Sequence, residues 1–331
     1  MSTSAFPALL QTFFTDRLLK QRQASPHTVR AYRDTFRLLL RFGAERLGRP
    51  PSRLELSNLD AEFLCDFLEH LEVERGNSAR TRNVRLAALH SFFRYVTFAE
   101  PAHALHCQRV LAIPSKRFKR GTVEFLSEEE IEALLDAPNA DTWLGRRDRA
   151  LLLVAIQTGL RVSELSALRR KDVALGTGAH VRCYGKGRKL RCTPLRPDTA
   201  QVLEAWMRES PSAPDGPVFP SSRGGRLTED AIKRRVVKHN DTAKEQCPSL
   251  ADRRITPHAL RHTTAMQLLQ NGVDRTVIAL WLGHESIETT QIYLHADMQL
   301  KERALAHTKT SGLSPERFVP SDDLLTFLDN L

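Results

Sequence analysis

The sequence has no long hydrophobic run, and none of its apolar stretches approaches the ~20 residues that a membrane-spanning helix requires. The opening MSTSAFPALLQTFF also lacks the positively charged segment that begins a secretory signal peptide. We therefore expect a cytoplasmic protein with no membrane partner.

Cysteine is scarce and is not arranged in pairs. The chain has five cysteines in 331 residues, an odd number, and no two of them have the CxxC spacing of a zinc or redox motif. This pattern argues against a disulfide framework and against structural zinc. Cys183 and Cys192 flank a predicted hairpin turn, and we interpret them as strand residues.

Positive charge is concentrated in the first third of the chain. The formal net charge is +10, and residues 1–120 carry 20 Lys and Arg against 11 Asp and Glu, so nine of the ten net charges lie there. Such an asymmetry is typical of a module that binds a polyanion, and double-stranded DNA is the expected partner.

Within this part, apolar periodicity predicts four helices, near residues 5–20, from Ser25 onward, near 60–74 and from 78 to about 96. The helix that begins after Ser25 combines an apolar face with a basic one, which suits packing on one side and phosphate on the other. The helix that begins at Ser78 opens with three arginines before its apolar residues. The predicted DNA-binding residues of these helices are Arg30, Arg33, Arg37, Arg41, Arg80, Arg82 and Arg85.

A short basic segment, IPSKRFKRGT, follows and has no helical periodicity. We expect a linker that crosses the DNA backbone through Lys116, Arg117, Lys119 and Arg120. Ser127 and Glu130 have the spacing of a capping box, which opens a second domain. The predicted boundaries are a helical domain at 1–108, the linker at 109–124, a second domain at 125–310 and a tail at 311–331.

The second domain is predicted to be mainly α-helical with one small β element. The segment HVRCYGKGRKLRCTPL alternates in polarity and turns at two glycines, so Lys186 is expected on a β-hairpin. An apolar helix precedes Arg161, and three or more helices follow residue 225.

Six residues of this domain have side chains suited to one reaction, and they are Arg161, Lys186, His258, Arg261, His284 and Tyr293. Two guanidinium groups match the charged oxygens of a phosphoryl transition state bidentately, so no metal ion is required. A tyrosine oxygen attacks phosphorus to form a covalent phosphotyrosine, which keeps the energy of the broken bond and requires no nucleotide cofactor. A lysine protonates the leaving 5′ oxygen. The histidines contact the phosphate or handle the phenol proton.

Other interpretations exist for single residues. Lys189 lies in the same charged run and competes with Lys186 for the role of proton donor. His258 and His262 have the i, i+4 spacing of a zinc motif, but Arg261 lies between them and residue 259 is not glutamate. We therefore predict no metal site.

The strings TGLRVSEL, GKGRK, HALRH, LGHES and TTQIYLHA, in this order, resemble the tyrosine recombinase (phage integrase) family, most closely its Xer-like and integrase-like members. The resemblance covers roughly residues 145–300 in detail. It implies a helical SAM-like core-binding domain joined to an α/β catalytic domain, with the six residues above as the catalytic set. It also implies that Glu164 supports the active site.

The resemblance further implies a site-specific recombinase or integrase that works through a 3′-phosphotyrosyl intermediate and a Holliday junction. Four protomers would act on paired inverted half-sites, either as a homotetramer or together with a related recombinase. The protein would be associated with the nucleoid and would belong to a mobile element. The alternatives are a type IB topoisomerase and a catalytically silent DNA-binding regulator. Integration, excision, dimer resolution and transposition all remain compatible outcomes.

The tail ends DDLLTFLDNL, whose apolar residues would share one face of a short helix. A helix of this length is unstable alone, so it must dock on another surface. The two alternatives are its own catalytic domain and a neighbouring protomer.

Overall fold

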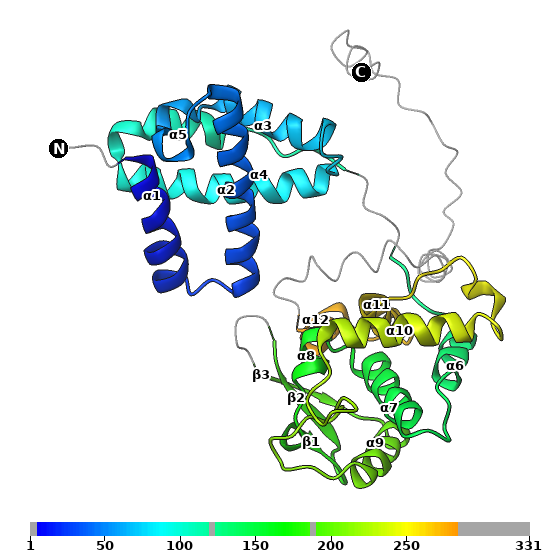
Figure 1. Ribbon diagram of the computed structural model, residues 1–331. Coiled ribbons are helices and arrows are strands. Elements are labelled where there is room, and N and C mark those ends of the chain that lie inside the picture. The colour runs from blue at the N-terminus through cyan, green and yellow to red at the C-terminus, as the bar shows by residue number, and fades with distance from the viewer. Residues whose placement is uncertain (1–4, 119–122, 186–189, 284–331) are drawn as a thin grey trace, which may run out of the picture. The chain divides into compact units, whose positions relative to one another are not determined.

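The computed structural model describes residues 5–118, 123–185 and 190–283. The chain divides into two compact units, Met1–Gly121 and Thr122–Leu331 (Figure 1). Among the described residues, strands occur only in the second unit, as one three-stranded sheet. The predicted fold class, mainly helical with a small sheet in the second domain, is therefore confirmed.

The first unit is built from helices alone. They are α1 Phe6–Thr12, which continues as the π-helical η1 Phe13–Gln21, then α2 Pro26–Leu47, α3 Ala61–Val73, α4 Ala79–Ala99 and α5 Ala104–Leu111, with 3₁₀ turns η2 Pro51–Arg53, η3 Leu56–Asn58 and η4 Pro101–His103. The two basic helices begin alike, because the hydroxyls of Ser25 and Ser78 accept the backbone N–H of Thr28 and Thr81. A capping hydroxyl satisfies one of the unpaired N–H groups of a first turn.

Helix α5 is a finding that the sequence pattern did not predict. Its eight residues give only about two turns of periodicity, too few to separate a helix from a loop. Buried Cys107 and Val110 join the core of the first unit, as does Ile113 beyond the helix end. The unit therefore extends past the predicted boundary at 108, and the first residues of the predicted linker belong to it.

An aromatic cluster holds the first unit together. Phe13, Phe36 and Phe92 are buried, with ring centroids 5.4 Å apart for Phe13 and Phe92 and 5.2 Å for Phe36 and Phe92. Each buried phenylalanine contributes about 1.5–3 kcal/mol relative to an exposed one. Since Phe36 comes from α2 and Phe92 from α4, this packing holds the two basic helices against each other.

The second unit carries the sheet between helices. Its elements are α6 Glu128–Asp136, α7 Trp143–Thr158, α8 Val162–Ala167, η5 Arg170–Asp172, β1 Val173–Ala174, β2 His180–Tyr184, β3 Leu190–Pro194, α9 Pro197–Glu209, α10 Glu229–Ala243, η7 Pro248–Leu250, α11 Pro257–Gln270 and α12 Arg275–Leu282. The predicted capping box of Ser127 and Glu130 is confirmed at the start of α6.

Helix α7 is the buried axis of this unit, and a buried ion pair ties it to α10. Arg147 and Asp148 are fully buried and share two hydrogen bonds, while the second oxygen of Asp148 lies 2.9 Å from His239 Nε2 on α10. Burial alone would raise the pKa of Asp148, but the hydrogen bonds from His239 and Arg147 leave that pKa below its ordinary value. The orientation of α7, which leads to Arg161, is thereby set.

The sheet is antiparallel in the order β1-β2-β3. Cys183 on β2 pairs with Arg191 on β3, and Arg182 pairs with Cys192. The two cysteines are therefore strand residues, as predicted, and all five cysteines carry free thiols. Among the described helices, none is long and apolar enough to cross a bilayer.

Candidate active site

Arg161 lies at the sharp corner between α7 and α8. Helix α7 ends at Gly159, whose φ of +62° belongs to the left-handed region that favours glycine. Arg161 then forms the N-cap of α8, and its backbone N–H donates to Glu164 Oε2 at 2.7 Å. The string TGLRVSEL thus encodes a helix end, a turn and a new helix start.

The two arginines predicted to bind phosphate lie at one place in the structure. Arg161 Nη2 donates to the carbonyl of Gly283 at 2.9 Å, and Arg261 Nη2 donates to the carbonyl of Leu282 at 2.6 Å. Arg261 Nη1 also donates to the carbonyl of Gly159, at 2.6 Å. Arg261 is buried, whereas a third of the Arg161 side chain is exposed. Consecutive carbonyls at the end of α12 therefore orient both guanidinium groups.

Glu164 is buried beside Arg161 and accepts hydrogen bonds from two arginines. Arg161 Nη1 lies 3.0 Å from Oε1, while Arg191 donates to both carboxylate oxygens at 2.8 Å. Burial alone would raise the pKa of Glu164, but the hydrogen bonds and charge of Arg191, followed by those of Arg161, hold that pKa below its usual value. Glu164 is therefore an anion, and it neutralises part of the guanidinium charge.

Arg191 is a site residue that the motifs do not single out, because in the sequence it is one member of a charged run. A usable signal existed in the hairpin pattern. Residues directly opposite each other on neighbouring antiparallel strands lie on the same face, and Arg191 is opposite buried Cys183. A correct register for the hairpin would therefore have placed Arg191 on the inner face.

The two histidines of HALRH lie on the first turns of α11. The ring centroids of His258 and His262 are 4.1 Å apart, and His258 is the exposed one. Burial, with smaller contributions from the charges of His258 and Arg261, lowers the pKa of His262 to about 4. His262 is therefore a neutral ring at neutral pH. In the described part of the chain, no group of three or more His, Cys, Asp or Glu side chains is placed to hold a metal ion.

Three predicted catalytic residues, Lys186, His284 and Tyr293, lie outside the described residues, as do Lys189 and the predicted tail helix. Their neighbours in the chain are part of the site. Lys186 belongs to the segment that joins β2 to β3, and His284 directly follows Gly283, the carbonyl acceptor of Arg161.

The glycine at the end of α7 provides a test of how tightly this corner is packed. A Cβ at Gly159 would meet Leu282 at 2.6 Å, and the backbone conformation itself disfavours a side chain. We expect Gly159→Ala to lower the free energy of unfolding by about 2–4 kcal/mol, from backbone strain plus overpacking. Thermal unfolding measures the loss.

The matched control is Gly272→Ala in the same unit. Gly272 has a φ of +77°, but a Cβ there would meet nothing within 4 Å. Its cost should be the strain alone, about 1 kcal/mol. Equal losses for the two variants would mean that the corner of Gly159 is loosely packed.

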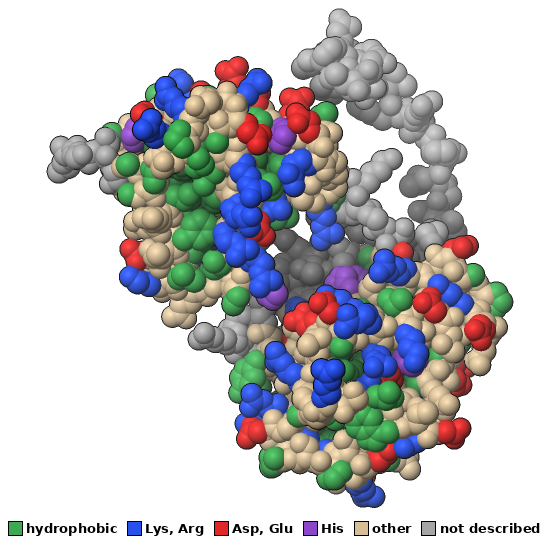
Figure 2. All heavy atoms as spheres, viewed as in Figure 1, with side chains coloured by type: hydrophobic (Ala, Val, Ile, Leu, Met, Phe, Trp, Pro, Cys, Tyr) green, Lys and Arg blue, Asp and Glu red, His purple; other side chains and the backbone are tan. Residues whose placement is uncertain are grey.

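The predicted DNA-binding arginines divide into exposed and buried ones. Arg30, Arg33, Arg37 and Arg41 on α2 and Arg80 on α4 are exposed, and Figure 2 shows basic side chains gathered where Figure 1 places α2. Arg30 and Arg80 line one hollow of about 390 Å³ between the first turns of the two helices. The first turns of helices carry partial positive charge, which favours an anion.

One of the predicted contacts requires correction, and a second also bonds within the first unit. Arg82 is buried with 6% exposure, donates to the carbonyl of Pro114 and lies 3.7 Å from Glu72, so it attaches the chain after α5 to α4. Arg85 is half-buried and donates to the carbonyl of Ala31 and the hydroxyl of Thr35, which joins α4 to α2. It also lines the hollow of Arg30 and Arg80, so its predicted contact with DNA stays a prediction. The helical spacing contains a signal for this, because Arg82 lies four residues before Leu86 and Arg85 lies four residues before Leu89, so both share the apolar face of α4.

The linker residues differ among themselves. Lys116 is exposed, and its ammonium group lies 2.7 Å from a carboxylate oxygen of Glu72. Arg117 is exposed, while Lys119 and Arg120 lie outside the described residues.

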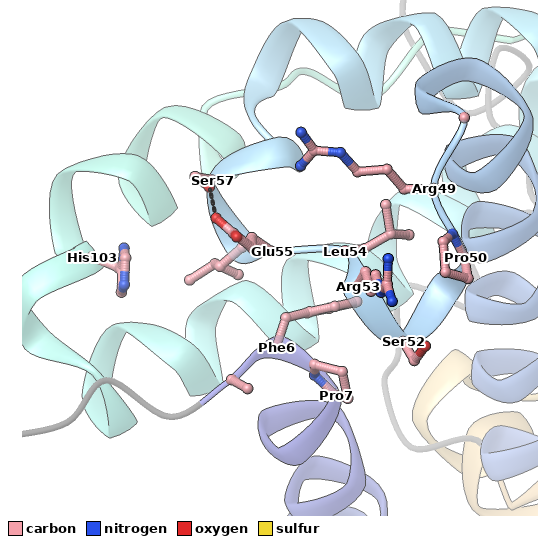
Figure 3. A pocket seen from close by; sticks show the side chains of 13 residues that line it. Phe6, Pro7, Arg49, Pro50, Ser52, Arg53, Leu54, Glu55, Ser57 and His103 are labelled. Carbon is pink, nitrogen blue, oxygen red and sulfur yellow. Dashed lines mark hydrogen bonds between the residues drawn. The ribbon is translucent and has the colours of Figure 1, made fainter.

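A cavity of about 720 Å³ in the first unit contains none of the predicted site residues. It lies between the start of α1 and the turns η2 and η3, where Arg49 and Arg53 point from one side and His103 stands on another (Figure 3). It belongs neither to the candidate active site nor to the hollow between α2 and α4.

Comparison with known proteins places both units in one family. Residues 124–300 match the model of the phage integrase family, and residues 12–99 match the N-terminal SAM-like domain of phage integrases. The chain is 55% identical over 323 residues to a protein of Sinorhizobium fredii (strain NBRC 101917 / NGR234) described as an integrase/recombinase, covering 98% of this chain and 97% of that protein.

Two further relatives are informative. The chain is 34% identical over 285 residues to the tyrosine recombinase XerC of Rhodospirillum centenum (strain ATCC 51521 / SW), covering 84% of this chain and 80% of that protein. The crystal structure of the XerH site-specific recombinase in a post-cleavage complex with a palindromic difH substrate has a TM-score of 0.68 at 24% identity, covering 86% and 81% of the two chains. The predicted pairing of a SAM-like domain with a phage integrase domain is confirmed.

Proposed function

The chain belongs to the phage integrase family of tyrosine recombinases, and on this premise we propose that it exchanges DNA strands at a specific site through a 3′-phosphotyrosyl intermediate and a Holliday junction. The observation that carries the proposal is the convergence of Arg161 and Arg261 on the consecutive carbonyls that precede His284. Two oriented guanidinium groups next to the segment that begins at His284 are suited to the charged oxygens of a phosphodiester, more than to a small polar substrate.

The proposed roles follow from chemistry. Arg161, which is partly exposed, binds the non-bridging oxygens of the scissile phosphate. Arg261, which is buried, adds positive electrostatic potential at the same phosphate. Tyr293 attacks phosphorus and forms the covalent bond to DNA, while Lys186 protonates the 5′ oxygen that leaves. His258 and His284 hydrogen-bond the phosphate or receive the phenol proton. No metal ion or nucleotide takes part in this scheme.

We propose that the first unit binds double-stranded DNA through the hollow between α2 and α4 and through Arg33, Arg37 and Arg41 further along α2. The SAM-like match at residues 12–99 favours a recombinase over a type IB topoisomerase. On DNA, four protomers would occupy paired inverted half-sites, and the tail of each would dock on a neighbour. The relatives described as integrases favour a recombinase that belongs to a mobile element. Such a protein would be cytoplasmic and associated with the nucleoid.

Covalent trapping tests this function directly. The purified chain is incubated in EDTA with nicked suicide duplexes made from the DNA that flanks its gene, and the products are separated on a denaturing gel. We expect a covalent protein–DNA adduct without added metal or nucleotide. Cleavage that requires Mg²⁺ and leaves no adduct would contradict the proposal.

Salt dependence tests the DNA-binding surface. Each phosphate contact that is lost should reduce the slope of log Kd against log salt concentration by about one. We expect this reduction for Arg30→Gln and for Arg80→Gln in half-site titrations. Arg46→Gln is the control, since Arg46 is exposed on the same helix, roughly 24 Å further along its axis at 1.5 Å per residue. Unchanged slopes for both test variants would remove the hollow from the interface.

A further inference from the structure

Arg191 makes the closest side-chain contacts with Glu164, although Arg191 lies on β3 and Glu164 lies on α8. Its two Nη atoms donate to the two oxygens of Glu164, each at 2.8 Å, and only 10% of its side chain is exposed. Arg161 contacts the same carboxylate through one Nη atom at 3.0 Å. Arg191 therefore has the bidentate contact, and Arg161 has a single one.

Because Arg191 bonds to both oxygens of Glu164, the second Nη atom of Arg161 is directed away from that carboxylate. Its second Nη atom donates to the carbonyl of Gly283, and a third of the side chain is exposed. Glu164 is three residues after Arg161 on one helical turn, so a bidentate pair between them is geometrically available. If Arg191 were absent, the buried carboxylate would have only Arg161 to compensate its charge. An uncompensated buried charge is strongly unfavourable, so Arg161 would turn toward Glu164.

The position of Arg191 in the chain adds a second connection. It is the second residue of β3, on the hairpin whose connecting segment contains Lys186. A Cβ at Gly283 would lie 2.8 Å from Arg191 Nη1, so this guanidinium also packs against the residue before His284. Arg191 thus connects three parts of the site. It lies on the strand that follows Lys186, it bonds to the carboxylate beside Arg161, and it packs against the segment that leads to His284.

We propose that Arg191 is a positioning residue: by occupying both oxygens of Glu164 it keeps Arg161 available for the scissile phosphate and anchors the Lys186 hairpin to the active site. This inference rests on the proposed function. It differs from a purely structural role, because Glu164 would become inhibitory once Arg191 is removed.

The experiment compares Arg191→Gln, Glu164→Gln, the double variant and Arg191→Lys. Single-turnover covalent trapping, half-site binding and thermal unfolding are measured for the full chain. We expect Arg191→Gln to bind a half-site normally and to slow trapping by roughly 10- to 100-fold, as misplacement of a catalytic group does. The double variant should trap several-fold faster than Arg191→Gln, because the carboxylate that captures Arg161 is gone.

Arg191→Lys keeps the charge but contacts only one oxygen at a time, so its rate should fall between the wild-type rate and the Arg191→Gln rate. It also decides the question if the glutamine variant fails to fold. The matched control is Arg208→Gln, which breaks an exposed Arg–Glu pair on α9 and should leave the rate unchanged.

Two results would overturn the inference. One is trapping at the wild-type rate by Arg191→Gln, or by Arg191→Lys where the glutamine variant does not fold. The other is a double variant that is as slow as Arg191→Gln or slower. Failure of the proposed function gives a different result, because the wild-type chain would then form no adduct at all.

Discussion

Tyr293→Phe is expected to form no covalent adduct with DNA while binding a half-site as the wild-type chain does. The substitution removes only the phenolic oxygen, which is the atom proposed to attack phosphorus, and it leaves every basic residue in place. The loss should therefore be complete in a suicide-substrate assay read on a denaturing gel. Binding, measured by gel shift on an intact half-site, should be unaffected.

Tyr184→Phe is the control for this experiment. Tyr184 is 69% exposed at the end of β2, so its hydroxyl is accessible and is the best rival nucleophile among the tyrosines that the structure describes. Its phenylalanine variant should trap DNA normally. Equal trapping by wild type and Tyr293→Phe would end the assignment of Tyr293 and direct attention to Tyr184 and the histidines.

The second large effect concerns proton transfer to the leaving group. Lys186→Ala should cleave ordinary DNA roughly 10²- to 10⁴-fold more slowly, because an unprotonated 5′ alkoxide is a poor leaving group. A substrate with sulfur at the bridging 5′ position releases a thiolate, which requires no proton. On that substrate the variant should recover much of the lost rate, as measured by single-turnover trapping.

Lys189→Ala provides the matched comparison, because Lys189 lies in the same segment between β2 and β3. It should be nearly normal on both substrates. A slow Lys189→Ala that sulfur rescues, together with a normal Lys186→Ala, would transfer the role to Lys189.

Much of this architecture was readable from local patterns. The capped, amphipathic helices beginning after Ser25 and Ser127, the hairpin around two glycines and the strings around Arg161 and Arg261 each depend on neighbours within one or two turns of chain. Side-chain hydroxyls that cap helices and glycines that permit tight turns act locally. The order of the motifs was then enough to indicate the family and the reaction, and the family matches agree with both.

Long-range contacts determined the rest. Arg82 and Arg85 lie on the apolar face of α4, and the partners of their guanidinium groups, Pro114 for Arg82 and Ala31 and Thr35 for Arg85, are far away in the chain. Helix α5 exists because Cys107 and Val110 complete a core made by other helices. Periodicity reports which face of a helix a residue occupies, but the neighbouring segment decides whether that face is surface or interior.

The same distinction applies to the active site. That Arg161, Glu164 and Arg261 are charged groups suited to a phosphodiester follows from their chemistry and their motifs alone. That Arg191 holds Glu164, and that two guanidinium groups meet on the carbonyls of Leu282 and Gly283, depends on how β3, α8 and α12 pack. Residue types set which interactions are possible, and only packing brings residues 27 to 122 positions apart within hydrogen-bonding distance.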